Sequence, residues 1–211
     1  MTAVLEIPTQ SQEVTTTGYL KPYRMTVEKY HQLVEAGIFS KHDQVQLLRG
    51  RLVEMTPKGV RHATTVRRTN RVFNRLFGEQ SVISVQDPIT LNDDSEPEPD
   101  LVLSRLPDVR YMLHHPKPED IYVVFEAADS TLAYDRDELG PLLAQNGVLQ
   151  FCLLNIRGRE LEDYREPSPN GYRTKRTYSE TENFSLAAFP DIQIQVSDLL
   201  PPVLATEESN A

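Results

Sequence analysis

SEPEPDLVLS, residues 95–104, is the stretch of sequence that decides the fold, because it sets an acidic residue directly before an apolar strand. Its prolines keep the approach to Asp100 extended. The next apolar segment, IYVVFEAADS at residues 121–130, carries Glu126 near its end. Burying a carboxylate alone is prohibitively costly, so each of the two must reach solvent, pair with a cation or bind a metal.

Carboxylates on neighbouring strands would form a hard-oxygen site that suits Mg²⁺ or Mn²⁺. The competing interpretation is that Asp100 and Glu126 only cap the ends of their strands or face solvent. The segments on either side help to decide between the two interpretations.

The chain before this stretch predicts a helix and a hairpin. Thr26 can cap a helix whose apolar stripe ends near Gly37. Residues 45–55 consist of two β-prone pieces around an Arg-Gly pair, which predicts a tight hairpin. The hairpin would put Gln46 early in its first strand.

A second helix is expected over residues 63–77, with apolar side chains on one face and basic ones on the other. The basic face either contacts phosphates or is simply solvated, as charged helix faces usually are. Its members are Arg67, Arg68, Arg71 and Arg75.

The central strands are predicted by β-branched, apolar segments between loop formers, at residues 81–91, 100–104, 121–127 and 148–156. Ser130 can cap a helix over residues 131–146, which Gly147 closes. Period-2 segments near the C-terminus predict an antiparallel meander. The fold class is therefore α/β (α+β), with a mixed central sheet flanked by helices and antiparallel C-terminal strands.

The length of 211 residues suits one domain with a sizeable core. We expect this domain over residues 21–203, between a flexible arm at residues 1–20 and a flexible tail at residues 204–211.

The net charge of −9 argues against an unspecific polyphosphate binder, which needs lysine and arginine to neutralise phosphates. No apolar run approaches the roughly 20 residues that span a bilayer, and the first residues lack an export signal. Cys152 cannot form an internal disulfide and is expected in the core. We therefore expect a cytoplasmic protein without a membrane segment.

Four segments carry a resemblance to a known family: RHA at residues 61–63, SVQDPITL at 84–91, SEPEPDLVL at 95–103 and YDRD at 134–137. These segments occur in the same order as in the family. Over roughly residues 20–200 the chain resembles the bacterial Uma-type family of restriction endonucleases in the PD-(D/E)XK nuclease superfamily. The resemblance implies a restriction-endonuclease-like core, hydrolysis of phosphodiester bonds in DNA with Mg²⁺ or Mn²⁺, and a homodimer. It implies that Asp100, Glu126 and the backbone carbonyl of Ala127 hold the metal.

Two positions depart from the family pattern. The family's first hairpin usually carries a glutamate and an aspartate where this chain has Gln46 and Arg49. The helix after the glutamate strand typically carries a lysine where this chain has Leu139. The superfamily's other lysine position, two residues beyond Glu126, holds Ala128.

Arg136, about one helical turn before Leu139, could reach the same pocket and stabilise charge, but its guanidinium stays protonated and cannot act as a base. One lost transition-state donor costs roughly 10²–10³ in rate, so the two departures predict impaired or lost activity. Three interpretations stay open: a metal-dependent endonuclease, an inactive module that binds nucleic acid or protein, and a purely structural dimerisation protein.

His62, at the entrance of the second helix, could touch a phosphate, although such a residue more often caps or packs. His114 and His115 lie in a loop rich in proline and charge, without the sequence spacing of a zinc site, and are expected to face solvent. Nucleic-acid contacts, if made, are expected from Arg61, His62, Arg67, Arg68, Arg71, Arg75 and Arg136.

Overall fold

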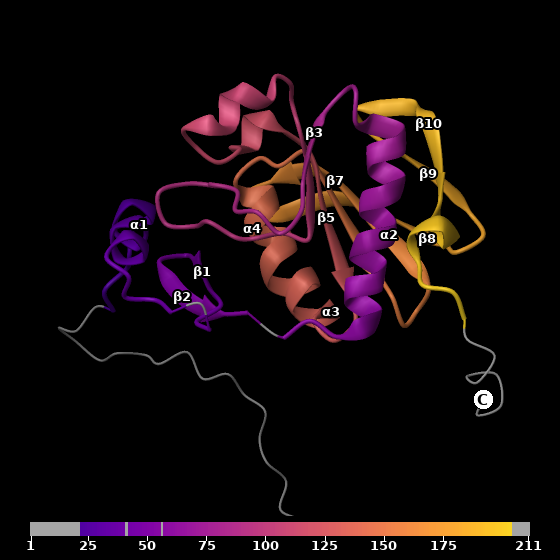
Figure 1. The fold of residues 1–211 in the computed structure, drawn as a ribbon. Coiled ribbons are helices and arrows are strands. Elements are labelled where there is room, and N and C mark those ends of the chain that lie inside the picture. The colour runs from indigo at the N-terminus through magenta and orange to yellow at the C-terminus, as the bar shows by residue number, and fades with distance from the viewer. Residues whose placement is uncertain (1–21, 41, 56, 204–211) are drawn as a thin grey trace, which may run out of the picture.

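The computed structural model describes residues 22–203 except residues 41 and 56, and forms a central sheet with helices against both faces (Figure 1). The arm expected at residues 1–20 and the tail expected at 204–211 lie outside the described residues.

A helix and a hairpin precede the sheet, as the sequence predicts. α1 (Val27–Glu35) begins after Thr26, whose hydroxyl accepts a hydrogen bond from the backbone of Lys29. The strands β1 (Val45–Leu48) and β2 (Arg51–Glu54) pair in antiparallel fashion. Their turn needs positive φ at both of its residues, and a Cβ on Gly50 would lie 2.8 Å from that of Arg24, so only glycine fits there.

The central sheet has six strands in the order β3 (Val82–Ser84), β4 (Leu101–Ser104), β5 (Ile121–Ala128), β6 (Gln150–Asn155), β7 (Glu160–Ser168) and β8 (Gly171–Ser179). β5 and β6 run parallel and the other neighbours antiparallel, which confirms the mixed sheet. The strand expected over residues 81–91 is wrong beyond Ser84. The backbone turns at Gln86, where φ is positive, and Pro88 has no N–H to donate to a ladder.

The expected C-terminal meander is only partly right. β6, β7 and β8 are consecutive antiparallel neighbours, but β9 (Asn183–Leu186) and β10 (Phe189–Gln195) form a separate two-stranded sheet. Phe184 of β9 and Ile194 of β10 lie in the same hydrophobic cluster as the buried residues of α5 (Val196–Leu199) and α2 (Val60–Phe77). α2 itself begins at Val60 rather than at residue 63.

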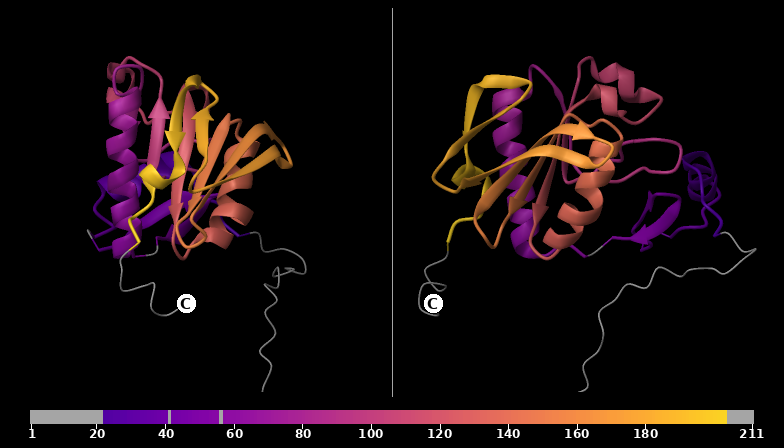
Figure 2. Two further views of the ribbon diagram at one scale, coloured as in Figure 1. Left: turned by 90° about the vertical axis from the view of Figure 1, so that its right-hand side faces the viewer. Right: turned by 180° about the vertical axis from the view of Figure 1, so that it is seen from behind.

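The sheet separates two hydrophobic clusters, and Figure 2 shows α2 on one side of it and α4 (Gly140–Gln145) on the other. Along β5, Phe125 and Ala127 belong to the cluster under α2, whereas Val124 and Ala128 belong to the cluster under α4. Since side chains alternate between the faces of a strand, Glu126 faces the α4 side. Cys152 is buried in the core, as expected.

The helix expected over residues 131–146 is not continuous. It consists of α3 (Leu132–Tyr134), a π-helical turn at Asp135–Leu139 and α4, and it begins after Thr131 rather than Ser130. Pro141 lacks the N–H that a regular helix would use at that point. The preceding Gly140 donates instead to the carbonyl of Asp135, which widens this turn.

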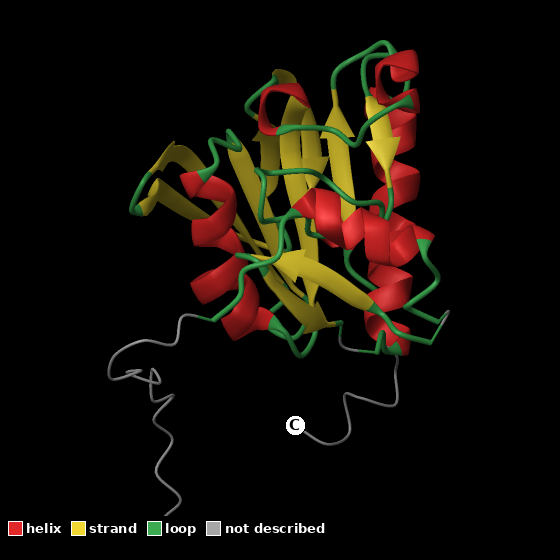
Figure 3. Cartoon of the chain, turned by 90° about the vertical axis from the view of Figure 1, so that its left-hand side faces the viewer, coloured by secondary structure: helices red, strands yellow, loops and turns green. Residues whose placement is uncertain are grey.

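Among the helices of residues 22–203, none has the length and apolar character needed to cross a membrane. Figure 3 is viewed from the side on which α1 and the β1–β2 hairpin lie, in front of the sheet.

Candidate active site

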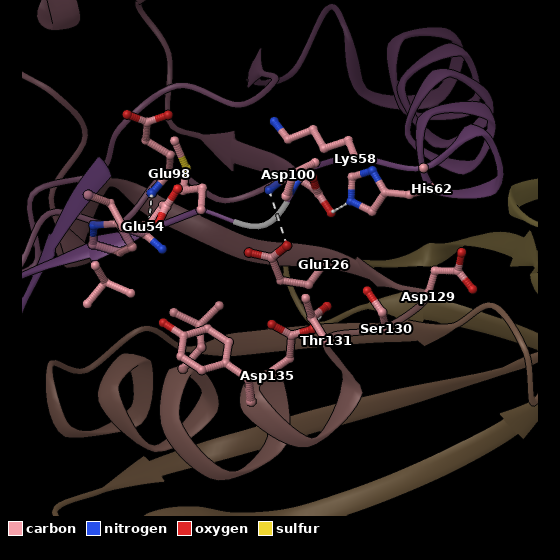
Figure 4. A pocket seen from close by; sticks show the side chains of 18 of the residues that line it. Glu54, Lys58, His62, Glu98, Asp100, Glu126, Asp129, Ser130, Thr131 and Asp135 are labelled. Atoms are coloured by element: carbon pink, nitrogen blue, oxygen red, sulfur yellow. Dashed lines mark hydrogen bonds and ion pairs between the residues drawn. The ribbon is translucent and has the colours of Figure 1, made fainter. Parts of the chain in front are cut away.

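Asp100, directly before β4, lies opposite Glu126 on β5. The antiparallel register pairs Leu101 with Phe125, so one further step sets Asp100 across from Glu126. The backbone N–H of Asp100 donates to Glu126 Oε2 over 3.4 Å. The two predicted carboxylates thus meet on the α4 face of the sheet (Figure 4).

Three hydrogen-bond donors hold the carboxylate of Asp100, a residue that is 4% exposed. Its Oδ2 accepts from His62 Nε2 at 2.8 Å and from the backbone of Ala127 at 3.0 Å, and its Oδ1 accepts from Gln86 Nε2 at 3.1 Å. Burial works against ionisation, but the hydrogen bond and charge of His62, together with the hydrogen bonds of Glu126 and Ala127, outweigh it and hold the pKa of Asp100 below its ordinary value. A carboxylate offers about four lone-pair sites, so a place for a cation is left.

The other carboxylates of the site repel one another. Burial, together with the charges of Asp100 and Asp135, raises the pKa of Glu126 well above its ordinary value. Burial likewise raises the pKa of Asp135 to about 6, against the hydrogen bond from Thr131. A divalent cation would relieve this repulsion, so the donor set fits a metal.

The backbone carbonyl of Ala127 faces the same place. The carbonyl of Ala128 accepts from Ile156 on the β6 side of the strand. Because consecutive carbonyls along a strand point to opposite neighbours, that of Ala127 points toward β4 and Asp100. The three oxygen ligands that the family resemblance implies, from Asp100, Glu126 and Ala127, therefore lie close together.

A cavity of about 580 Å³ opens in front of these groups. Gln46 and Leu139 line it, so both departures from the family pattern lie beside Asp100 and Glu126. The side-chain oxygen of Gln46 accepts from the backbone of Glu98 over 3.1 Å. Gln46 therefore supports the segment that leads to Asp100.

Acidic residues outnumber basic ones in the wall of the cavity. They are Glu54, Glu98, Asp100, Glu126, Asp129 and Asp135. The basic residues that line it are Lys58, His62 and Arg157, and Arg157 pairs with Asp129 at 2.9 Å. Without added cations, this cavity would repel a phosphodiester.

Asp135 and Lys58 are among the cavity residues that the sequence did not predict for the site. Asp135 enters it from the π-helical turn, and the YDRD segment was the signal that could have indicated it. Lys58 reaches it from the loop before α2, on the same side as Asp100 and His62 (Figure 4). Its charge lowers the pKa of Glu98, which burial raises more strongly. No sequence pattern indicated Lys58.

His62 and Arg136 differ from their expected placement. The sequence favours a capping or packing role for His62 over a phosphate contact, but His62 contacts the carboxylate of Asp100. Arg136, expected to reach the cavity, instead donates two hydrogen bonds to Glu162 and does not line the cavity.

The basic face of α2 is present, with Arg61, Arg67, Arg71 and Arg75 exposed along the helix. Arg68 is half-buried, and its Nε is enclosed without a hydrogen-bond partner among the described residues. Contact between the basic face of α2 and nucleic acid stays a prediction.

Comparisons with known proteins identify the fold and the family of this chain. The chain resembles a "putative nuclease belonging to DUF820" from Anabaena variabilis ATCC 29413, with a TM-score of 0.64, 11% sequence identity and a match over 83% of this chain and 97% of that one. At this identity the likeness shows the fold alone. No curated protein matches the chain. Residues 27–197 match the model of the Uma2 family, described as "Putative restriction endonuclease", and the protein belongs to this family.

Proposed function

We propose that the protein is a divalent-metal-dependent endonuclease of the PD-(D/E)XK type that cleaves DNA at a reduced rate. The observation that carries the proposal is the opposition of Asp100 and Glu126 in an acidic cavity. Buried carboxylates this close repel one another unless a cation joins them.

Asp100, Glu126 and the carbonyl of Ala127 would hold Mg²⁺ or Mn²⁺, since oxygen donors suit these ions. When bound, such an ion polarises a phosphate and lowers the pKa of an attacking water. His62 keeps Asp100 ionised and oriented for this purpose. Membership in the family supports the assignment.

Lys58 would supply the positive charge that Leu139 cannot. A lysine beside the reacting phosphate stabilises the charge that develops in the transition state. Lys58 is exposed and lies on a loop, so it is held less rigidly than a helical lysine would be. We therefore expect slow cleavage rather than none.

DNA is the substrate that the family description supports. The exposed arginines of α2 run along the helix that carries His62 in its first turn, and would contact phosphates flanking the cleaved bond. The homodimer expected from the resemblance stays a prediction.

A second candidate function is an inactive module that binds nucleic acid or protein. The observation that favours it is that Leu139 and Gln46, the two residues that depart from the family pattern, both stabilise the fold. Leu139 is 5% exposed within the hydrophobic cluster under α4, and the amide of Gln46 supports the backbone of Glu98.

The test is a calorimetric titration of Mg²⁺ and Mn²⁺ into wild-type protein, Asp100→Ala and Asp191→Ala, with plasmid nicking read on the same samples. Asp191 is an exposed acid on β10 and serves as the matched control. We expect binding and nicking in the wild type and control and neither in Asp100→Ala. Binding without nicking would support the inactive module, and equal binding by all three would refute a metal site at Asp100.

A further inference from the structure

We propose that His31, Glu96 and His115 form a second metal site, which takes Zn²⁺ and lies outside the cavity of Asp100 and Glu126. One ligand atom of each residue lies within 4.8 Å of the ligand atoms of the other two. None of the three residues lines the cavity described above. The proposal does not depend on the nuclease function.

The three residues come from segments that are far apart in the sequence. His31 lies on α1, Glu96 in the approach to β4, and His115 in the loop after the 3-10 helix at Asp108–Met112. Figure 1 shows the loop between β3 and β4 reaching toward α1. The sequence expectation that His115 faces solvent is wrong, since it is half-buried against His31, with ring centroids 6.2 Å apart.

Glu96 is the centre of this cluster. Its side chain is 2% exposed, and its Oε1 lies 2.6 Å from His31 Nε2. Its other oxygen accepts from the hydroxyl of Thr90 at 2.6 Å, and its backbone N–H donates to Leu47 over 2.7 Å. Held from behind in this way, the buried carboxylate turns Oε1 to the imidazole of His31, with His115 close by. Supporting contacts of this kind orient metal ligands in proteins.

The donor types select the metal. Two imidazole nitrogens and one carboxylate oxygen suit Zn²⁺, whereas Mg²⁺ prefers oxygen donors alone. Zinc–ligand distances of about 2.0–2.1 Å in a tetrahedral site set the ligand atoms about 3.3 Å apart. The distance between His31 Nε2 and Glu96 Oε1, now 2.6 Å, must therefore increase by less than an ångström. The His31 side chain is 44% exposed and has room to move, and water would complete the coordination.

A zinc ion here would tie α1 and the loop that carries His115 to the approach to β4. Glu96 precedes Asp100 by four residues, so the ion would steady the segment that positions Asp100. Its role would be structural, because His31 and His115 do not reach the cavity. The alternative is a plain ion pair between His31 and Glu96, which would bind no metal.

The test uses untagged protein that carries Asp100→Ala, so that zinc does not bind at the cavity. Calorimetric Zn²⁺ titration is followed by Co²⁺ absorbance, which reports tetrahedral coordination. The variants His31→Ala and His115→Ala are compared with His114→Ala, an exposed histidine next in sequence to His115. Circular dichroism checks that each variant is folded.

We expect one Zn²⁺ per chain, with an affinity that falls by more than about 100-fold in His31→Ala and His115→Ala, because loss of a supporting partner alone costs 10–100-fold. Thr90→Val, which removes such a partner, should lose about 10–100-fold, and His114→Ala should bind like its parent. Zinc at about 100 times its dissociation constant should raise Tm by about 5–10 °C. Unchanged affinity in His31→Ala and His115→Ala, or no binding by the parent, would overturn the proposal and leave the ion pair.

Discussion

His62 Nε2 lies 2.8 Å from Asp100 Oδ2, although the two residues are 38 positions apart in the chain. Since an ionised carboxylate can only accept hydrogen bonds, the nitrogen facing it carries the proton. The contact joins the first turn of α2 to the head of β4. The candidate metal ligand is thereby oriented by the protein itself, before any cation binds.

The first prediction concerns metal-dependent stability. Glu126→Gln removes a charge whose burial beside Asp100 is unfavourable. The metal-free variant should therefore gain stability relative to the wild type as pH rises above about 4.5, the ordinary pKa of a glutamate, and should no longer bind the metal. At 100 times its dissociation constant, Mn²⁺ should stabilise the wild type by about 2.7 kcal/mol and the variant by almost nothing.

Thermal unfolding with and without Mn²⁺ measures both effects. Glu119→Gln, a change at an exposed residue outside the cavity, is the control and should respond to Mn²⁺ like the wild type. An equal Mn²⁺ shift in wild type and Glu126→Gln would contradict the assigned ligand.

The second prediction is a pH dependence that comes from Asp135. Its pKa is raised from 3.8 to about 6, so the folded state holds this proton more tightly than the unfolded state. The stability that protonated Asp135 contributes is full below about pH 4 and is lost as pH rises through about 6. Asp135→Asn keeps the oxygen that accepts from Thr131 and removes the titration.

Between pH 4 and 7, metal-free Asp135→Asn should therefore gain stability relative to the wild type, by about 2–3 kcal/mol. Denaturant unfolding at several pH values in a chelating buffer measures the difference. A difference that does not vary with pH would mean that Asp135 ionises normally in the folded protein.

The third prediction is a gain of activity at the two altered positions. Gln46→Glu adds a carboxylate to the cavity, and Leu139→Lys adds an amine to it. The double variant should bind Mn²⁺ more tightly and nick plasmid DNA about 10²-fold faster than the wild type, the size of one transition-state donor.

Leu139→Met is the matched control, because it conserves volume and adds no charge. It should leave nicking unchanged. Since Leu139 is buried, circular dichroism must show that the lysine variant folds. A folded double variant with no gain would indicate that the cavity no longer aligns a substrate.

The fourth prediction concerns Lys58. Lys58→Ala should slow nicking by roughly 10-fold to 10²-fold while metal affinity stays equal or rises, because a cation that competes for the acidic wall is removed. Lys58→Arg should retain part of the rate, since it keeps the charge. Lys117→Ala, a change at an exposed lysine outside the cavity, should have no effect. Nicking that survives Lys58→Ala unchanged would exclude this role.

Local patterns in the sequence were sufficient to predict the strands, the hairpin and the positions of the two carboxylates. The apolar runs that contain Asp100 and Glu126 predict neighbouring strands, and the Arg-Gly pair predicts the hairpin turn. These features depend on residues near one another in the chain. For the same reason, the helix over residues 131–146 was predicted in the right place, although not with its π-helical turn.

What the sequence by itself determined is therefore the family, the mixed sheet and the pairing of Asp100 with Glu126. Only the tertiary structure decided that His62, Lys58 and Asp135 join this pair, that Arg136 binds Glu162, and that His31 meets Glu96 and His115. These contacts depend on how α1, α2 and the broken helix pack against the sheet. Packing joins residues of distant segments, and its geometry leaves no periodic signal in the sequence.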